Sequence, residues 1–135
     1  MVFEFISWIK EQDFYQDTVI VVVGDHLSMD KEYFTNWDEN YERSIFNLYL
    51  NTDKESINNI NREFTSLDLY PTTLSAMSVD VKDNRLGLGV DLFSGEPTIV
   101  EMIGLENFSN ELLKRSKYYQ ENILQGTDIL AEVEN

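Results

Sequence analysis

The stretch TVIVVVGDH, residues 18–26, decides the fold that we expect for this chain. A short, uncharged run of β-branched residues is typical of a strand buried on both faces inside a parallel sheet. Ligands and catalytic groups gather where such strands end, and this one ends at Asp25 and His26, the only histidine. Side chains of adjacent strand residues normally point to opposite faces, but Gly24 can bend the backbone so that the two converge. We therefore predict that Asp25 and His26 form part of a metal site.

The elements around this strand predict an α/β fold with a mostly parallel or mixed sheet sandwiched by helices. Residues 2–12 have the spacing of an amphipathic helix, and residues 13–17 form the turn into the strand. Residues 43–50 are apolar at most positions and predict a second strand. Between the strands, residues 27–42 mix polar and aromatic side chains, and they form either the wall of a pocket or a solvated loop.

The second half of the chain predicts two more helices, over residues 65–77 and 106–124, and a glycine-interrupted extended segment over residues 86–93. Residues 1–124 then make one domain, and residues 125–135 an acidic, frayed tail. The helix over residues 65–77 has three candidate capping residues, a proline that we place in its first turn, and an apolar face. The candidate caps are Thr65, Ser66 and Asp68, and the proline is Pro71. The apolar face consists of Leu67, Leu74 and Met77.

Composition excludes several classes of protein. With 135 residues, 42% of them hydrophobic, the chain can bury a core and is not disordered throughout. Its net charge of −15 argues against binding to nucleic acid or to anionic membrane surfaces, because both would repel it. The absence of cysteine excludes disulfides, thiolate metal sites and a cysteine nucleophile. No apolar run reaches the roughly 20 residues of a membrane helix, and the N-terminal residues do not resemble a signal peptide.

The chemistry of Asp25 and His26 suits a divalent cation. A carboxylate and a neutral imidazole are ligands for Mn²⁺, Zn²⁺ or Mg²⁺. A catalytic ion needs at least three protein ligands, so these two residues can supply only part of a site. The same three-residue pattern, Gly24-Asp25-His26, also occurs as a plain turn with a hydrogen-bonded histidine, and spacing alone does not separate these interpretations.

Four segments resemble a known family. Gly24-Asp25-His26 after a valine-rich strand is similar to the metal-binding Asp-His of the alkaline phosphatase superfamily. More narrowly it resembles the sulfatase-like phosphoglycerol transferases, the group that contains lipoteichoic acid synthase. Arg43 opens the next strand as in that group. Residues 67–74 resemble its Asp-x-x-Pro-Thr-x-Leu helix, and residues 89–94 its Gly-x-(Asp/Asn)-Leu-Phe-Ser segment.

The resemblance implies a partial alkaline phosphatase-like domain and a membrane-anchored parent enzyme with an extracellular catalytic domain. Such enzymes transfer phosphoglycerol from a phosphatidylglycerol headgroup through a covalent threonine intermediate, with one divalent cation, often manganese. By this resemblance Asp25 and His26 are two of the metal ligands. The nucleophile and the first acidic ligand lie upstream in the family and have no counterpart here, and the Cys/Ser-x-Pro-x-Arg motif of sulfatases has none either. We therefore expect residues 1–124 to match the C-terminal portion of the catalytic domain and to be inactive alone.

The implied partners are the upstream remainder of the same catalytic domain and a phospholipid headgroup, with no nucleic acid. A different class remains open, that of a free-standing acidic α/β signalling or binding module without catalysis. Receiver domains of that class need a phosphoacceptor aspartate at the end of a later strand. Here the strand over residues 43–50 is followed by Asn51 instead.

Overall fold

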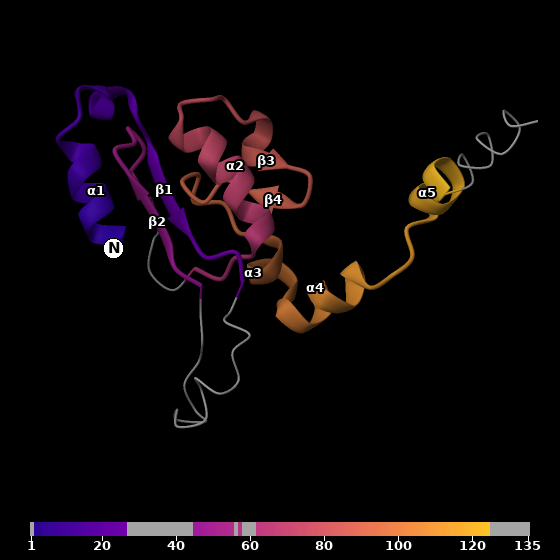
Figure 1. Ribbon diagram of the computed structural model, residues 1–135. Helices are drawn as coiled ribbons and strands as arrows, with labels where there is room; N and C mark the ends of the chain where they lie inside the picture. The colour runs from indigo at the N-terminus through magenta and orange to yellow at the C-terminus, as the bar shows by residue number, and fades with distance from the viewer. Residues whose placement is uncertain (1, 27–44, 56, 58–61, 125–135) are drawn as a thin grey trace, which may run out of the picture.

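The computed structural model describes residues 2–26, 45–55, 57 and 62–124. Helices and short strands alternate along these ranges, so the chain is a mixed α/β protein (Figure 1). Its elements, in chain order, are α1 (Val2–Lys10), the 3₁₀ helix η1 (Asp13–Asp17), β1 (Ile20–Val23), β2 (Asn47–Leu50), α2 (Ser66–Ala76), the 3₁₀ helix η2 (Lys82–Asn84), β3 (Arg85–Leu86), β4 (Gly89–Val90), α3 (Ile99–Ile103), α4 (Leu105–Leu112), α5 (Lys117–Tyr119) and the π-helix η3 (Gln120–Leu124).

The β1–β2 pair lies between two helices, with α1 on one side and α2 on the other (Figure 1). Helix α1 agrees with the expected amphipathic helix, because it buries Ile6 and Ile9 and exposes most of its other residues. On the opposite side, the Tyr49 hydroxyl of β2 donates to the backbone oxygen of Leu69 in α2 at 3.2 Å. Burial raises the pKa of Tyr49, and the negative charge of Asp91 adds to this, so the hydroxyl keeps its proton for that bond.

The expectation of a mostly parallel or mixed sheet is not met in the described residues. β1 pairs with β2 in antiparallel register, from Ile20 opposite Leu50 to Val23 opposite Asn47, and β3 pairs with β4 in the same sense. Nor is β1 buried on both faces, since Ile20 is its one buried residue and Val23 is 40% exposed. An apolar, β-branched run predicts burial and a strand, but it carries no information on the direction of the neighbouring strand.

Helix α2 begins as the sequence predicts, at Thr65, but buries a different face. The Thr65 hydroxyl accepts a hydrogen bond from the backbone N–H of Leu67, and the Asp68 carboxylate accepts one from the N–H of Thr65 at 2.8 Å. The expected apolar face is wrong, because Leu67 and Met77 are 42% and 50% exposed. Pro71 also lies beyond the first turn, and the buried residues of the helix are Asp68, Pro71, Thr72, Ser75 and Ala76.

Polar residues can occupy the buried face of α2 because strand β4 and the residues after it satisfy their hydrogen bonds. Asp68 accepts from the backbone N–H of Val90 at 2.8 Å, and the Thr72 hydroxyl accepts from that of Leu92 at 3.0 Å. Gly89 packs directly on the helix backbone, where a Cβ atom would lie 2.1 Å from the carbonyl oxygen of Leu67. Pro71 has no N–H to bond that carbonyl within the helix. We call this contact the α2–β4 junction.

A partly buried ion pair ties α3 to the segment that precedes α2. Arg62, whose side chain is 9% exposed, donates to both carboxylate oxygens of Glu101, at 2.7 and 2.9 Å. Glu101 also completes the capping box of α3 by accepting from the backbone N–H of Thr98. Burial alone would raise the pKa of Glu101, but the hydrogen bonds from Arg62, Thr98 and Glu63 outweigh it and hold the pKa below its ordinary value.

We expect Glu101→Gln to lower the free energy of unfolding at pH 7 by about 2 kcal/mol, because it leaves the Arg62 charge buried without its partner. A lowered pKa means that this contribution is present above about pH 4.3, the ordinary glutamate pKa, and is lost as the pH falls through the folded-state value. Urea denaturation of both proteins should therefore give converging stabilities in acid. Glu11→Gln, at an exposed position, is the control and should change little; a gap that persists in acid would contradict the assignment.

The single helix expected over residues 106–124 is broken. Helix α4 covers Leu105–Leu112, and after a gap a new helix starts at Ser116, whose hydroxyl accepts from the backbone N–H of Tyr119 at 3.2 Å. The break follows from this cap, because a serine that bonds the next turn favours the start of a helix over its interior. The expected tail, residues 125–135, and the loop over residues 27–42 lie outside the described residues. None of the described helices has both the length and the apolar character needed to cross a lipid bilayer.

Candidate metal site at the end of strand β1

The backbone of the β1–β2 pair positions Asp25 and His26. The N–H of Gly24 donates to the carbonyl oxygen of Phe46 at 2.8 Å, so the ladder continues one residue beyond β1. A Cβ atom on Gly24 would lie 3.2 Å from the Cβ of Ile45, which is tighter than most such contacts. The absence of a side chain at Gly24 therefore lets the two strand segments approach closely. The backbone turns away from the ladder only at Asp25 and His26.

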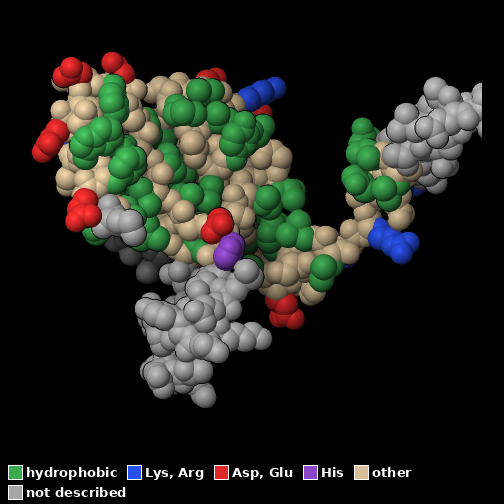
Figure 2. Space-filling model, in the orientation of Figure 1, with side chains coloured by type: hydrophobic (Ala, Val, Ile, Leu, Met, Phe, Trp, Pro, Cys, Tyr) green, Lys and Arg blue, Asp and Glu red, His purple; other side chains and the backbone are tan. Residues whose placement is uncertain are grey.

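The Asp25 and His26 side chains converge, as predicted. One carboxylate oxygen of Asp25 accepts a hydrogen bond from the backbone N–H of His26 at 2.9 Å, and the other lies 3.6 Å from His26 Nε2. Gly24 is not among the glycines with positive φ, so the bend at Asp25 and His26, and not a left-handed glycine, brings the two groups together. The histidine lies at the surface beside an acidic side chain (Figure 2).

This separation fits two ligands of one cation. Metal–nitrogen and metal–oxygen bonds of about 2.0–2.2 Å allow two ligand atoms on the same ion to lie up to about 4.4 Å apart, and Asp25 Oδ2 and His26 Nε2 are within that limit. Both side chains are well exposed, 89% for Asp25 and 59% for His26, so the pair is accessible. Within the described ranges, no group of three or more His, Cys, Asp or Glu side chains could hold an ion. The pair supplies two ligands and needs others.

The other segments of the resemblance do not join this pair. Residues 67–74 and 89–94 meet each other at the α2–β4 junction, where Asp68, Thr72 and Gly89 have structural roles. Arg43 lies outside the described residues. These segments therefore determine how α2 packs, and they supply no ligand to the end of β1 among the contacts seen.

One polar residue near the pair was not selected from the sequence. Asn47 is the β2 partner of Val23, and its side-chain oxygen is buried with no hydrogen-bond partner among the residues that the structure describes. A buried, unpaired amide oxygen is costly. Its sequence signal is an asparagine inside the otherwise apolar run of residues 45–50.

Comparison of the chain with protein-family models, with characterised proteins and with solved structures finds no match.

Proposed function

We propose that this chain is the C-terminal portion of a sulfatase-like, metal-dependent phosphoglycerol transferase, in which Asp25 and His26 hold a divalent cation. The observation that carries the proposal is the convergence of the two side chains at the end of β1, with Asp25 Oδ2 3.6 Å from His26 Nε2. Manganese is the first candidate, and zinc or magnesium the alternatives, because the donor set is one carboxylate and one imidazole. The substrate class is a phosphatidylglycerol-type headgroup.

In this proposal the cation, when bound, stabilises charge on the transferring phosphoryl oxygens and lowers the pKa of the nucleophile. The residues of this chain orient the ion. His26 ligates through a neutral ring nitrogen, and Asp25 supplies a negative charge that offsets part of the cation's charge. The threonine nucleophile and the remaining ligands come from an upstream portion of the same enzyme, whose catalytic domain is extracellular and membrane-anchored.

The small core of the described residues supports the idea of a partner portion. Two-stranded sheets are marginally stable alone, and β1 and β2 each have an outer edge without a strand partner in the described ranges. Additional strands at the β1 edge would extend this pair into the larger, mostly parallel or mixed sheet of a partial alkaline phosphatase-like domain. Many large apolar side chains are also at least 40% exposed, among them Phe3, Phe46, Leu105 and Leu113.

We expect the chain to bind Mn²⁺ weakly at pH 7.5, and Asp25→Ala or His26→Ala to weaken that binding by at least about tenfold. Isothermal titration calorimetry of the chain measures this directly, with Asp53→Ala, at an exposed aspartate elsewhere, as the control. Equal affinities in all four proteins would contradict the proposal and favour an acidic binding module without a metal.

The class of enzyme is tested separately by the DNA upstream of the Met1 codon. The proposal expects an open reading frame that encodes transmembrane segments and a strand that ends in a threonine nucleophile. The complete protein should then release glycerol phosphate from labelled phosphatidylglycerol, and its His26→Ala variant should not. A stop codon and a promoter immediately upstream would contradict it.

A further inference from the structure

Three aromatic rings form a contiguous, half-exposed row on the outside of α1 and η1. Phe5 stacks on Trp8 with ring centroids 6.0 Å apart, and Trp8 meets Phe14 edge-on at 6.4 Å. Their exposed fractions are 59%, 52% and 50%. Acidic residues lie in and beside the same elements, namely Glu4, Glu11, Asp13 and Asp17. We call Phe5, Trp8 and Phe14 the aromatic row; it is an apolar surface with an acidic surround.

A segment of opposite character follows α4 and includes α5. Lys114, Arg115 and Lys117 fall within four residues and are followed by Tyr118 and Tyr119, all five of them exposed. We call residues 114–119 the basic arm. Lys114 makes a local ion pair with Glu111, which is weak at the surface. In a chain with a net charge of −15, this is an unusually dense group of positive charges.

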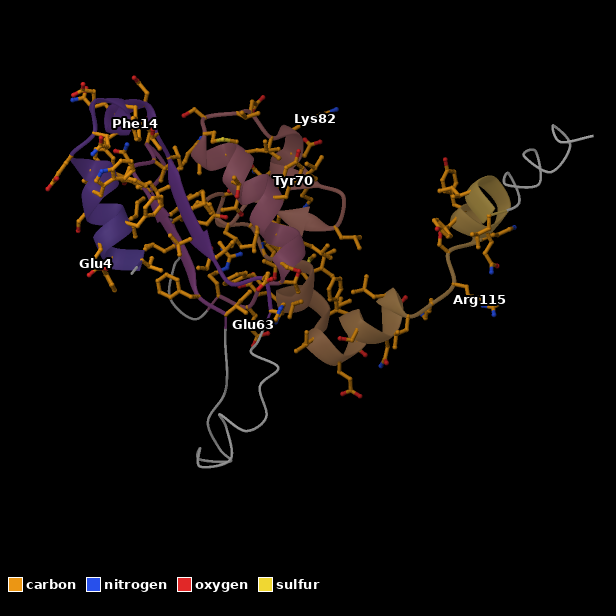
Figure 3. The ribbon with its side chains drawn as sticks, in the orientation of Figure 1. Glu4, Phe14, Glu63, Tyr70, Lys82 and Arg115 are labelled. Atoms are coloured by element: carbon orange, nitrogen blue, oxygen red, sulfur yellow. The ribbon has the colours of Figure 1, made fainter. Side chains whose placement is uncertain are left out.

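The arm cannot reach the aromatic row of its own chain in this arrangement. Figure 1 shows the chain leading away from the other elements after α4, and α5 lies at the opposite end of the molecule from α1. Figure 3 shows the same for single residues, with Phe14 at one end and Arg115 at the other. Contacts of α5 with other elements are concentrated on η3, the helix that follows it.

We propose that the basic arm of one copy of this chain docks on the aromatic row of a second copy. The two surfaces are complementary in charge and in the contacts that their side chains can make. The lysine and arginine side chains of the arm can form ion pairs with the acidic surround. The arginine and the tyrosine rings can also pack against the aromatic row. Tyrosine, tryptophan and arginine are also the residues that dominate interface energies. The exchange is reciprocal under two-fold symmetry, so that each dimer contains the contact twice. It uses neither Asp25 nor His26.

Analytical ultracentrifugation of the chain over a range of concentrations tests the exchange. We expect a reversible dimer at low salt, and a dissociation constant about tenfold higher or more in the triple variant K114Q/R115Q/K117Q. The control is K54Q/K82Q, which removes positive charges from exposed positions outside both the arm and α1 and should leave the dimer intact. A monomer at all concentrations, or equal effects of the two variants, would overturn the proposal. His26→Ala should not alter the dimer, so this result is independent of metal binding.

The absence of cysteine permits a second test of which copies touch. Ser7→Cys places a thiol on α1, and Gln120→Cys places one just after the basic arm. Mixed single-cysteine proteins treated with a short bismaleimide should give a crosslinked heterodimer that K114Q/R115Q/K117Q weakens. A crosslink found only within a monomer that carries both cysteines would overturn the proposal in favour of an arm folded onto its own chain. Sedimentation of a monomeric chain with phosphatidylglycerol vesicles, but not phosphatidylcholine vesicles, would overturn it in favour of a membrane contact.

Discussion

Gly89→Ala is expected to lower the free energy of unfolding by about 3 kcal/mol or more. The added Cβ atom would lie 2.1 Å from the carbonyl oxygen of Leu67 and 3.0 Å from the Pro71 ring. The first of these neighbours is helix backbone, which cannot rotate away as a side chain could, so either α2 or β4 must move. That movement would also stretch the hydrogen bond from the Val90 N–H to Asp68. Urea denaturation followed by circular dichroism measures the loss.

Gly87→Ala is the matched control for this prediction. Gly87 lies two residues away in the β3–β4 turn and has a φ of +62°, but a Cβ atom there would meet nothing within 4 Å. Its replacement therefore costs only the strain of a left-handed alanine, about 1 kcal/mol. Equal losses in the two variants would show that backbone strain, and not contact with α2, limits stability at this turn.

Asp68→Asn is expected to cost about 2–4 kcal/mol although it preserves the shape of the side chain. The Asp68 carboxylate is 2% exposed and accepts from the backbone N–H groups of Thr65 and Val90, one on each oxygen. Asparagine would keep one acceptor and place an NH₂ group against the other N–H, which leaves two buried donors facing each other. If the retained oxygen faces Val90, the bond that is lost is the Asp68 half of the capping box of α2.

Hydrogen exchange gives this prediction a local signature. In the Asp68→Asn protein, the amide protons of Val90 and Leu92 should exchange faster than in the parent chain, because both are held by residues of α2. Asp80→Asn, at an exposed aspartate beyond the end of α2, should change neither the stability nor these amides. An unchanged Val90 amide would mean that the asparagine keeps its oxygen on Val90 and loses the helix cap instead.

Local patterns predicted the elements better than their packing. The spacing of Ile6 and Ile9 predicted α1, and Thr65 was among the predicted caps of α2, because both depend on residues close in sequence. The antiparallel direction of β2 could not be predicted, since pairing direction depends on the path of the intervening chain. The buried face of α2 was also missed. Asp68 and Thr72 look solvent-facing in a helical pattern, and only the approach of β4 makes them inward-facing.

For the candidate site, too, the sequence predicted the local arrangement but not the contacts with distant residues. We predicted that Gly24 would bend the backbone and make Asp25 and His26 converge. The two side chains do lie close together, but the bend is at Asp25 and His26 themselves and not at Gly24. The remaining ligands were not predictable, because metal ligands converge from distant parts of a chain and one sequence records no such proximity. Metal binding itself stays a prediction. The segments over residues 67–74 and 89–94 were recognised as separate motifs, whereas in space they form one contact.

The outer edge of β1 has a consequence for the behaviour of the isolated chain. A short run of isoleucine and valine without charge or proline, and with no strand on its outer edge among the described residues, is a template for adding strands from other molecules. Sheet growth of this kind leads to fibrils and precipitates. The large negative charge opposes it at neutral pH by keeping molecules apart. Solubility of the isolated chain therefore depends on its carboxylates remaining ionised, and it diminishes as acid neutralises them.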